Sequence, residues 1–271
     1  MSEEPLIARI AAASTAFHAG WLELLREQPG NPSGVDIVRL AEGRIVATVA
    51  TEMPEVEWLQ HVCGLRAGDD EEIFELATWY AELDAWPRYE VPVDAEDDLL
   101  HTLLAVEAKP TGALAVLAGD LADLMASPLR GHVRVSEVFA GSPAVEQFAR
   151  AHLAGHEVPG GGAPEHVAAV AGWVAQPDWR CFLAELEGEI VGAAALVVLD
   201  DVGYLANAST LPLARSRGVQ SALIAARIDA ARALRCDLVC SLAEPDGSSA
   251  RNLVRAGLGV VGARTYWSST A

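Results

Sequence analysis

Residues 211–221 most constrain what this chain can fold into, because they join an apolar strand to an apolar helix through a turn of arginine and glycine. Gly218 lacks a Cβ, so the main chain can approach a bound group closely there. The helix that follows, at 222–234, begins with unpaired N–H groups and the positive end of its dipole. With Arg215 and Arg217 able to make bidentate contacts, this turn predicts a phosphate site.

The charge distribution also favours a small anionic ligand. The chain has 19 basic and 38 acidic residues and a net charge of −19. Between residues 215 and 264, however, eight arginines stand against four acidic residues. Nucleic-acid binding needs broad phosphate neutralisation, so a local basic patch in an acidic chain is more typical of a small anion site. The alternative is that Arg215 and Arg217 are solvated loop charges.

The turn resembles the acyl-CoA signature of the GNAT superfamily of N-acyltransferases, Arg-x-x-Gly-x-(Gly/Ala) between a strand and a helix. Here it reads Arg215-Ser216-Arg217-Gly218-Val219-Gln220, with Pro212 before it. The resemblance covers residues 132–271 and implies a mixed α/β fold. Periodicity and turn signals place the elements in the family's order: strands at 133–138, 179–186, 189–199, 204–211, 237–243 and 259–267, and helices at 143–153, 165–175, 221–234 and 248–256.

The resemblance implies that acetyl-CoA, or another acyl-CoA, lies between the fourth and fifth of these strands. Main-chain groups of the fourth strand would pair with the pantetheine amides, and N–H groups of the turn would hold the pyrophosphate. A polar side chain on the later helix would contact the pantetheine arm. The implied cofactor-binding residues are Ser209, Thr210, Leu211, Arg215, Ser216, Arg217, Gly218, Val219, Gln220, Ser221 and Asn252.

The resemblance further implies an N-acetyltransferase in which an amine attacks the thioester directly. The amine must be neutral, so a base or a water chain has to remove its proton. Glu244, at the end of the fifth strand, is the tentative catalytic base if partial burial tunes it toward neutral pH. The alternative is that Glu244 is a solvated turn residue without a catalytic role. The family often has a proton-donating Tyr where this chain has Leu253, so a CoA-binding regulatory module without turnover is the rival function.

The first half of the chain resembles a degenerate copy of the second. Glu42-Gly43 echoes Glu187-Gly188, 145 residues further on. At the position of the arginine turn this half carries four consecutive acidic residues, 69–72, which would repel a pyrophosphate. The predicted elements of this half are helices at 6–27, 71–83 and 95–106 and strands at 56–65, 89–93 and 112–118.

We therefore expect two GNAT-like domains in tandem. Residues 1–129 form a partial, degenerate domain without the cofactor turn, and residues 130–271 form the acyl-CoA-binding domain. The alternative is that the first half is an unrelated α/β domain with one coincidental hairpin.

The remaining features predict a cytoplasmic protein with no membrane or nucleic-acid partner. The start of the sequence is acidic, and no apolar run approaches the roughly 20 residues that span a bilayer. The four cysteines form no Cys-x-x-Cys pair, which favours reduced core cysteines and no metal site. The acceptor would be a small-molecule or peptide amine, and homodimer formation stays open. A zinc-dependent hydrolase is a third possibility, with His152, His156 and His166 as ligands, but we interpret these histidines as solvated.

Overall fold

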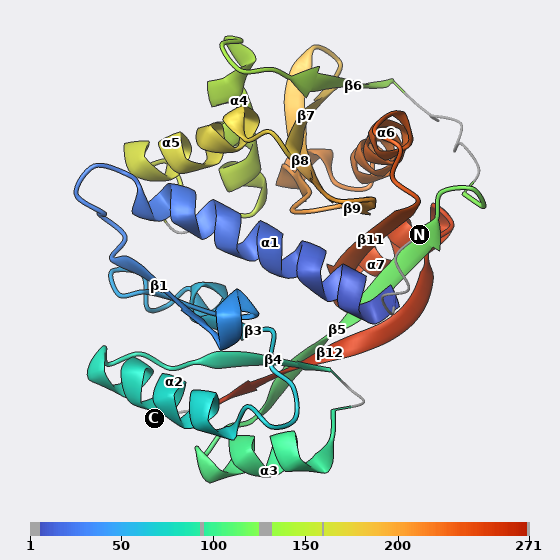
Figure 1. The fold of residues 1–271 in the computed structure, drawn as a ribbon. Helices are drawn as coiled ribbons and strands as arrows, with labels where there is room; N and C mark the ends of the chain where they lie inside the picture. Colours follow the sequence, from blue (N-terminus) through green and yellow to red (C-terminus); the bar gives the residue numbers. More distant parts are fainter. Residues whose placement is uncertain (1–5, 93–94, 125–131, 159, 270–271) are drawn as a thin grey trace. The chain divides into compact units, whose positions relative to one another are not determined.

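The computed structural model describes residues 6–92, 95–124, 132–158 and 160–269, and it has the predicted mixed α/β fold (Figure 1). The chain divides into two compact units. Unit 1 comprises Met1–Phe17 and Leu117–Val261, and unit 2 comprises His18–Val116 and Gly262–Ala271. The predicted domain boundary between residues 129 and 130 lies outside the described residues.

Unit 1 contains a mixed sheet with the strand order β5-β11-β9-β8-β7-β6. Neighbours from β6 to β9 run antiparallel, whereas β9 and β11 run parallel. The short strand β10 pairs antiparallel with β8. The bounds are β6 (Val133–Val138), β7 (Trp179–Leu186), β8 (Glu189–Leu199), β9 (Val202–Tyr204), β10 (Ser209–Thr210) and β11 (Leu238–Ala243).

Helices cover both faces of this sheet. In Figure 1, α4 (Ala144–Gly155) and α5 (Pro164–Gly172) lie on one side of β7 and β8, and α6 (Val219–Ala233) lies on the other. A shorter helix, α7 (Ser248–Arg255), follows β11. The short 3-10 helices of this unit are η3 (Trp173–Ala175) and η4 (Pro212–Ala214).

Unit 1 also includes the first residues of α1 (Leu6–Arg26). Phe17 stacks against Trp179 and Tyr204, with ring centroids 5.3 and 5.6 Å apart. Arg9 donates to the carboxylates of Asp201 and Asp237 at 2.7 and 2.5 Å. The beginning of the chain therefore supplies both apolar packing and ion pairs to this unit.

The strands of unit 2 are also mixed, with the order β1-β2-β3-β4-β12-β5. β1, β2 and β3 are antiparallel neighbours, and β3 runs parallel to β4. The bounds are β1 (Val35–Leu40), β2 (Ile45–Ala50), β3 (His61–Cys63), β4 (Arg88–Pro92), α2 (Asp70–Glu82), α3 (Asp97–Ala105), η1 (Ala41–Gly43) and η2 (Glu57–Leu59).

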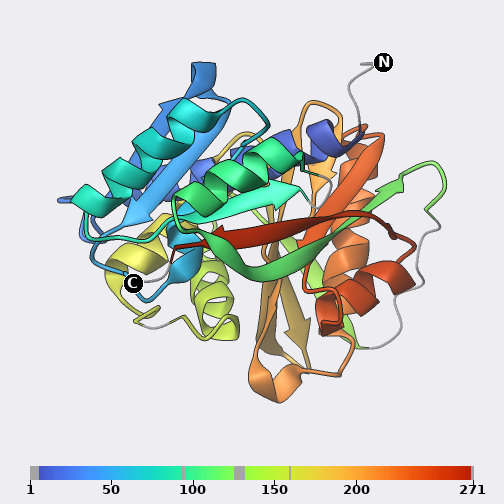
Figure 2. The same cartoon turned by 90° about the horizontal axis from the view of Figure 1, so that it is seen from below.

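Two long strands, β5 (Lys109–Asp120) and β12 (Gly259–Ser268), belong partly to each unit. They lie side by side, as Figure 2 shows. Within unit 2, residues 264–268 of β12 pair antiparallel with residues 88–92 of β4. Each unit is thus completed by a strand segment from the other half of the sequence.

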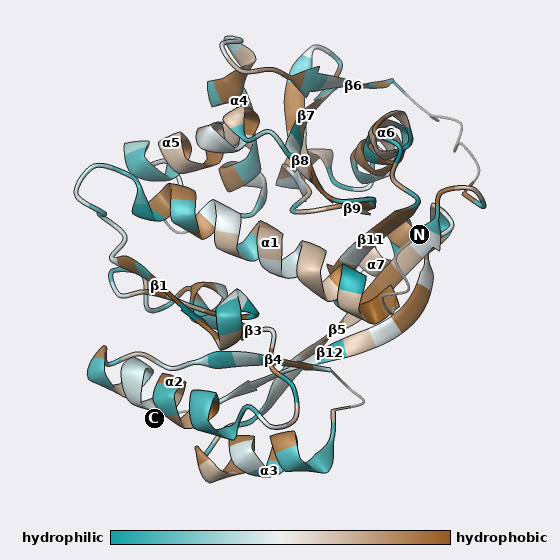
Figure 3. Ribbon diagram, in the orientation of Figure 1, coloured by the Kyte–Doolittle hydropathy of each residue, from teal (hydrophilic) through white to brown (hydrophobic). Residues whose placement is uncertain are grey.

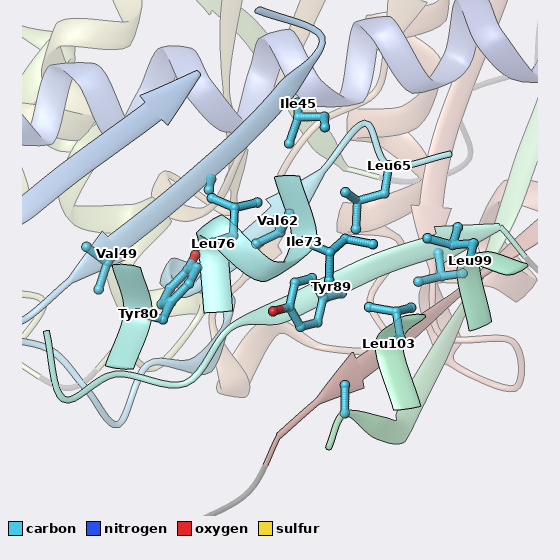
Figure 4. Packing of buried hydrophobic residues seen from close by; sticks show 13 residues of the cluster. Ile45, Val49, Val62, Leu65, Ile73, Leu76, Tyr80, Tyr89, Leu99 and Leu103 are labelled. Carbon is cyan, nitrogen blue, oxygen red and sulfur yellow. The ribbon is translucent and has the colours of Figure 1, made fainter. Parts of the chain in front are cut away.

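The core of unit 2 follows from the spacing of apolar residues on α2. Ile73, Leu76 and Tyr80 recur every three or four positions and are buried, as an amphipathic helix on a sheet requires. The acidic residues of α2 are hydrophilic, and Figure 3 shows teal positions along this helix beside paler and brown ones. Figure 4 shows the three side chains packed among strand residues that include Val62 and Tyr89. The Tyr80 hydroxyl donates to the Thr48 carbonyl at 2.6 Å, so its buried polar atom is satisfied.

Left-handed residues recur at matching places in the two halves. Glu42 and Gly43 have φ of 58° and 89°, and Glu187 and Gly188 have 57° and 89°. Glu187 and Gly188 form the two-residue loop of a tight hairpin, as in a type I′ turn, since Leu186 pairs with Glu189. The loop of the first half is longer, because Leu40 pairs with Ile45 and Ala41 is left-handed as well. Before helices α2 and α6, Gly68 and Gly218 have φ of 89° and 86°. The two halves therefore share left-handed positions but differ in the length of this hairpin loop.

Two predicted strands differ in the structure. The strand expected at 204–211 is divided into β9 and β10. The strand expected at 56–65 is a 3-10 turn, η2, followed by the short strand β3. An apolar run predicts burial in both cases, but it does not reveal where the ladder of hydrogen bonds is interrupted.

Candidate functional site

The start of α6 has the backbone geometry of an anion site. Gly218 adopts φ 86° and ψ 0°, a left-handed conformation that favours glycine. The first intrahelical bond is donated by the Ala222 N–H to the Gly218 carbonyl at 3.0 Å. The N–H groups of the first turn, from Val219 through Gln220 to Ser221, therefore precede any intrahelical acceptor. They converge at the positive end of the helix dipole, where a phosphate binds well.

Ser216 adds a second left-handed residue to this turn, with φ 64°. Successive N–H groups around left-handed residues form a concave arrangement that suits an anion. The helix begins at Val219, two residues earlier than the sequence predicts. The turn that precedes it is consequently tighter and brings more main-chain donors together.

The two arginines of the turn are partly exposed and form ion pairs. Arg215 contacts Glu157 and Arg217 contacts Glu187, at 2.8 and 2.7 Å. Exposed pairs of this kind contribute at most about 1 kcal/mol, so little free energy holds either guanidinium away from an incoming anion. Arg215 Nε also donates to the Thr210 carbonyl at 3.4 Å.

The strand beside the turn is interrupted by one extra residue. Tyr204 pairs with Val197, and Ser209 pairs with Ala193. Five steps along β9 and β10 therefore match four steps along β8, which defines a β-bulge. Asn207 lies in the bulge with φ 28°, a conformation that Asn tolerates better than most residues.

Beyond the bulge, the fourth and fifth strands no longer pair. β9 pairs with β11 up to Cys240, whose carbonyl accepts the Leu205 N–H at 2.8 Å. Among the described residues, β10 pairs with β8 alone. One edge of β10 faces β8. The opposite edge, which in β9 pairs with β11, has no strand partner among the described residues, and we call it the open side of β10.

The ladder to β8 determines which groups of β10 face the open side. The Leu211 N–H donates to the Val191 carbonyl at 2.8 Å. Because donors alternate along an antiparallel pair, the N–H of Thr210 points away from β8, whereas Ser209 and Leu211 point toward it. The Ser209 hydroxyl is buried and donates to the Ala151 carbonyl of α4 at 3.4 Å. Thr210 is therefore the predicted residue best placed for a ligand amide.

The residues expected on the fifth strand and the later helix have different surroundings. Glu244 is exposed in the turn after β11, so the partial burial on which its assignment as a base depended is absent. Asn252 is half-buried on α7 and accepts a hydrogen bond from Arg255 at 2.5 Å. Leu253 is 2% exposed and belongs to the core.

The basic patch predicted from the count of arginines is dispersed in the structure. Arg227 is buried within α6, and Arg264 is buried in unit 2. Arg232 contacts Asp229 of its own helix at 3.0 Å. Anion selectivity of the turn therefore depends on its N–H groups and on Arg215 and Arg217. The sequence does not distinguish a buried arginine on a helix from an exposed one, so the burial of Arg227 is not predictable from it.

The histidines are not arranged as metal ligands. Within the described ranges, no group of three or more His, Cys, Asp or Glu is placed to hold a metal ion. The interpretation of His152 as solvated is wrong. It is 4% exposed and packs edge-on against Trp173, with ring centroids 4.8 Å apart. Burial, with a smaller contribution from His156, holds the pKa of His152 well below its usual range.

At the corresponding helix start of unit 2, a side chain of the unit provides the negative charge. Asp69 is buried after the left-handed Gly68, and Arg44 donates to its two oxygens at 2.8 and 2.6 Å. The Arg66 N–H donates to the same carboxylate at 2.8 Å. Burial alone would raise the pKa of Asp69, but these bonds bring it below the ordinary value.

Comparison with known proteins agrees with this geometry. Residues 148–259 match the model of the Acetyltransferase (GNAT) family. This segment is a GNAT acetyltransferase domain. It contains the bulge, the Gly218 turn and both helices that follow, so the family prediction is confirmed. A search of curated proteins gives no match.

Solved structures show that the GNAT fold extends over nearly the whole chain. A GCN5-related N-acetyltransferase from Kribbella flavida is 18% identical, with a TM-score of 0.69 over 98% of this chain and 96% of that one. One from Sphaerobacter thermophilus is 16% identical, with a TM-score of 0.62 over 97% and 91%. A tandem GNAT protein from the clavulanic acid biosynthesis pathway is 13% identical, with a TM-score of 0.60 over 95% of each chain. The predicted tandem fold is confirmed.

Two further findings concern the helices and the cysteines of the chain. Among the helices that the structure describes, none combines the length and apolar character needed to cross a bilayer. Cys63, Cys181, Cys236 and Cys240 are all buried thiols that are not joined in disulfides. Burial raises the pKa of the Cys240 thiol to about 12, so this thiol is not a reactive nucleophile.

Proposed function

We propose that this protein is an acyl-CoA-dependent N-acyltransferase that moves an acetyl or similar acyl group to the amine of a small molecule or peptide. One observation carries the proposal. The left-handed Gly218 presents the first turn of α6 next to β10, a strand with one open side. The first feature suits a pyrophosphate and the second suits a ligand with amides along its length.

The described residues suit an acyl-CoA in a definite order. The N–H groups from Ser216 to Ser221 would hold the pyrophosphate, with Arg215 and Arg217 exchanging their surface partners for it. The outward-facing N–H of Thr210 would bind a pantetheine amide. Asn252 would contact the same arm from α7. The acyl end of the ligand then lies toward the bulge at Asn207.

Acyl-CoA supplies an acyl group activated as a thioester. An amine positioned near the bulge attacks the carbonyl carbon directly, so the enzyme needs no nucleophile of its own. The amine must give up a proton, and water at the open side of β10 is the acceptor that this arrangement supports best. Glu244 is exposed, which suits a role in passing that proton to solvent.

A second candidate function is a CoA-binding module without turnover. Leu253 favours it, because a buried leucine stands where the family often has its proton donor. Turnover would then require the sulfur to leave as a thiolate, with solvent supplying its proton afterwards.

Two measurements on the wild-type protein test the proposal. Calorimetric titration with CoA establishes whether the site binds the coenzyme. Thiol release from acetyl-CoA is then followed with a panel of amines. Amine-dependent thiol release supports the transferase. Saturable CoA binding with no amine-dependent release across the panel supports the module, and no binding of CoA contradicts both.

A further inference from the structure

Arg227 is a buried arginine in the middle of α6, among apolar neighbours such as Leu223 and Ile228. Its side chain is part of a residue that is only 1% exposed. Within the described part of the chain, no carboxylate forms an ion pair with it. Burying a charge without a counter-ion is costly unless its N–H groups are used in hydrogen bonds. An apolar side chain at this position would pack without that desolvation cost, so the presence of a buried guanidinium points to a function other than packing.

The hydrogen bonds of Arg227 converge on the interruption in the fourth strand. Nη1 donates to the Ala206 carbonyl at 3.0 Å and to the Ala195 carbonyl at 3.2 Å. Nε donates to the Leu223 carbonyl of its own helix at 3.1 Å, which fixes the side chain. The Ala206 carbonyl also accepts the Ala195 N–H at 3.3 Å. The guanidinium thus joins α6, β8 and the bulge.

These bonds act on the peptide group between Ala206 and Asn207. A cation that binds the carbonyl oxygen draws electron density through the conjugated peptide bond and makes its N–H a stronger donor. That N–H belongs to Asn207, and among the described residues no main-chain or side-chain acceptor receives it. The bond to Arg227 also holds Asn207 at its φ of 28°.

We propose that Arg227 is a positioning residue that orients and polarises this peptide so that the Asn207 N–H binds the thioester carbonyl oxygen. The inference rests on the proposed acyl-CoA function. With the pyrophosphate at 216–221 and the pantetheine arm along β10, the acyl carbonyl reaches the bulge. When the nitrogen lone pair of the amine forms a bond to the carbonyl carbon, the C=O π pair moves onto oxygen, and a fixed N–H donor stabilises this negative charge. The same pair re-forms the C=O bond as the C–S bond breaks, its electrons leave with sulfur, and the amine proton passes to water.

The test is isotope-edited infrared spectroscopy of acetyl-CoA labelled at its thioester carbonyl carbon. Bound to the wild type, the carbonyl band is expected at lower wavenumber than in water. Arg227→Met keeps the length of the side chain but removes its donors, so the shift should be lost. Arg227→Lys keeps the charge but cannot hold two carbonyls in the same geometry, and it should retain part of the shift. Arg232→Met, on the same helix, is the control that should keep all of it.

Calorimetric affinity for CoA, which has no acyl carbonyl, should change less than about threefold in all these variants. With any amine that the wild type accepts, Arg227→Met should lower kcat about tenfold and leave KM for acetyl-CoA nearly constant. This loss is smaller than that for a direct oxyanion donor. A merely structural role would not separate the carbonyl band and kcat from CoA affinity in this way.

The outcomes separate this inference from the proposed function. If the wild type binds no CoA, the proposed function fails. If it binds acetyl-CoA but the band does not shift, or if Arg227→Met keeps the shift, Arg227 does not have this role and the acyl-CoA site stands. Should Arg227→Met not fold, the wild-type band and Arg227→Lys decide, and a Lys variant with the full wild-type shift overturns the inference.

Discussion

Gly68 and Gly218 adopt the same left-handed conformation before a helix, yet the residues after them create opposite electrostatic environments. After Gly68, the carboxylate of Asp69 accepts bonds from Arg44 and from the Arg66 N–H. After Gly218, Val219, Gln220 and Ser221 bring no charge of their own. One helix start therefore contains its own anion, and the other is left for a ligand.

The pair of Asp69 and Arg44 predicts a pH-dependent contribution to stability. Because the pKa of Asp69 lies below the ordinary 3.8 in the folded state, the pair stabilises the protein above that pH. The contribution is lost as the pH falls through the lower, folded value. Asp69→Asn should reduce the free energy of unfolding at pH 7 by about 1–3 kcal/mol. Denaturant titrations at several pH values measure it.

The exposed Glu71→Gln provides the control for this variant and should change stability by less than about 0.5 kcal/mol. CoA affinity should stay at the wild-type value in Asp69→Asn. An Asp69→Asn protein as stable as the wild type at pH 7, or a difference in stability that does not narrow as the pH is lowered into the acid range, would refute the account of this pair.

The Gly218 turn is predictable from the sequence because glycine, arginine and a following helix are local signals. The acidic residues 69–72 are locally visible as a site that would repel a pyrophosphate, but the bond of Asp69 to Arg44, 25 residues away along the chain, is not. The burial of Arg227 is not predictable either, since it depends on tertiary packing. Local chemistry was predictable, and long-range partners were not.

At the scale of elements, the division of the fourth strand into β9 and β10 creates the open side of the site. The sequence predicts one strand over 204–211 because its residues are mostly apolar. Asn207, a residue that tolerates positive φ, is the sole local hint of the bulge. Elements with a strong period, including β7 and β8, have the predicted bounds, since a two-residue hairpin turn separates them.

Gly192 of β8 lies where the first turn of α6 packs close to β10, so adding a methyl group at this position should disturb that packing. A Cβ at Gly192 would lie 2.7 Å from the Ser209 carbonyl oxygen and 2.9 Å from a Val219 methyl group. Gly192→Ala should therefore push the first turn of α6 away from β10. We expect a loss of about 1–3 kcal/mol in stability and weaker CoA binding, measured by thermal unfolding and calorimetry.

Gly259→Ala is the matched control, because nothing lies within 4 Å of a Cβ at that position. It should leave both quantities near the wild-type values. If Gly192→Ala bound CoA as tightly as the wild type, the first turn of α6 would not be part of the site.

At the scale of the whole molecule, the two halves of the sequence do not fold as separate blocks. Residues 264–268 at the end of the chain pair with β4 in unit 2. Residues 6–17 at its start supply Arg9 and Phe17 to unit 1. An apolar, alternating strand predicts its own existence but not its neighbour, which is why the sequence does not show this exchange.

This exchange predicts that the second half cannot stand alone. A fragment of residues 132–271 lacks β4, the strand β5 next to β11, and the aromatic contacts of Phe17. We expect it to show no cooperative thermal transition, whereas co-expression with residues 1–131 should restore one. Cooperative unfolding of the isolated fragment near the wild-type midpoint would show that the exchanged segments are dispensable.

The most direct test of the whole account is calorimetric titration of CoA into Gly218→Asp. Aspartate tolerates the left-handed conformation, so the fold should persist while a like charge meets the pyrophosphate. The account predicts at least about a 100-fold loss of affinity, corresponding to about 2.7 kcal/mol. Gly218→Asn, of the same size without the charge, should lose less, and Gly68→Asp in unit 2 should lose nothing. Wild-type CoA affinity in a folded Gly218→Asp protein would contradict the assignment of this turn as the coenzyme site.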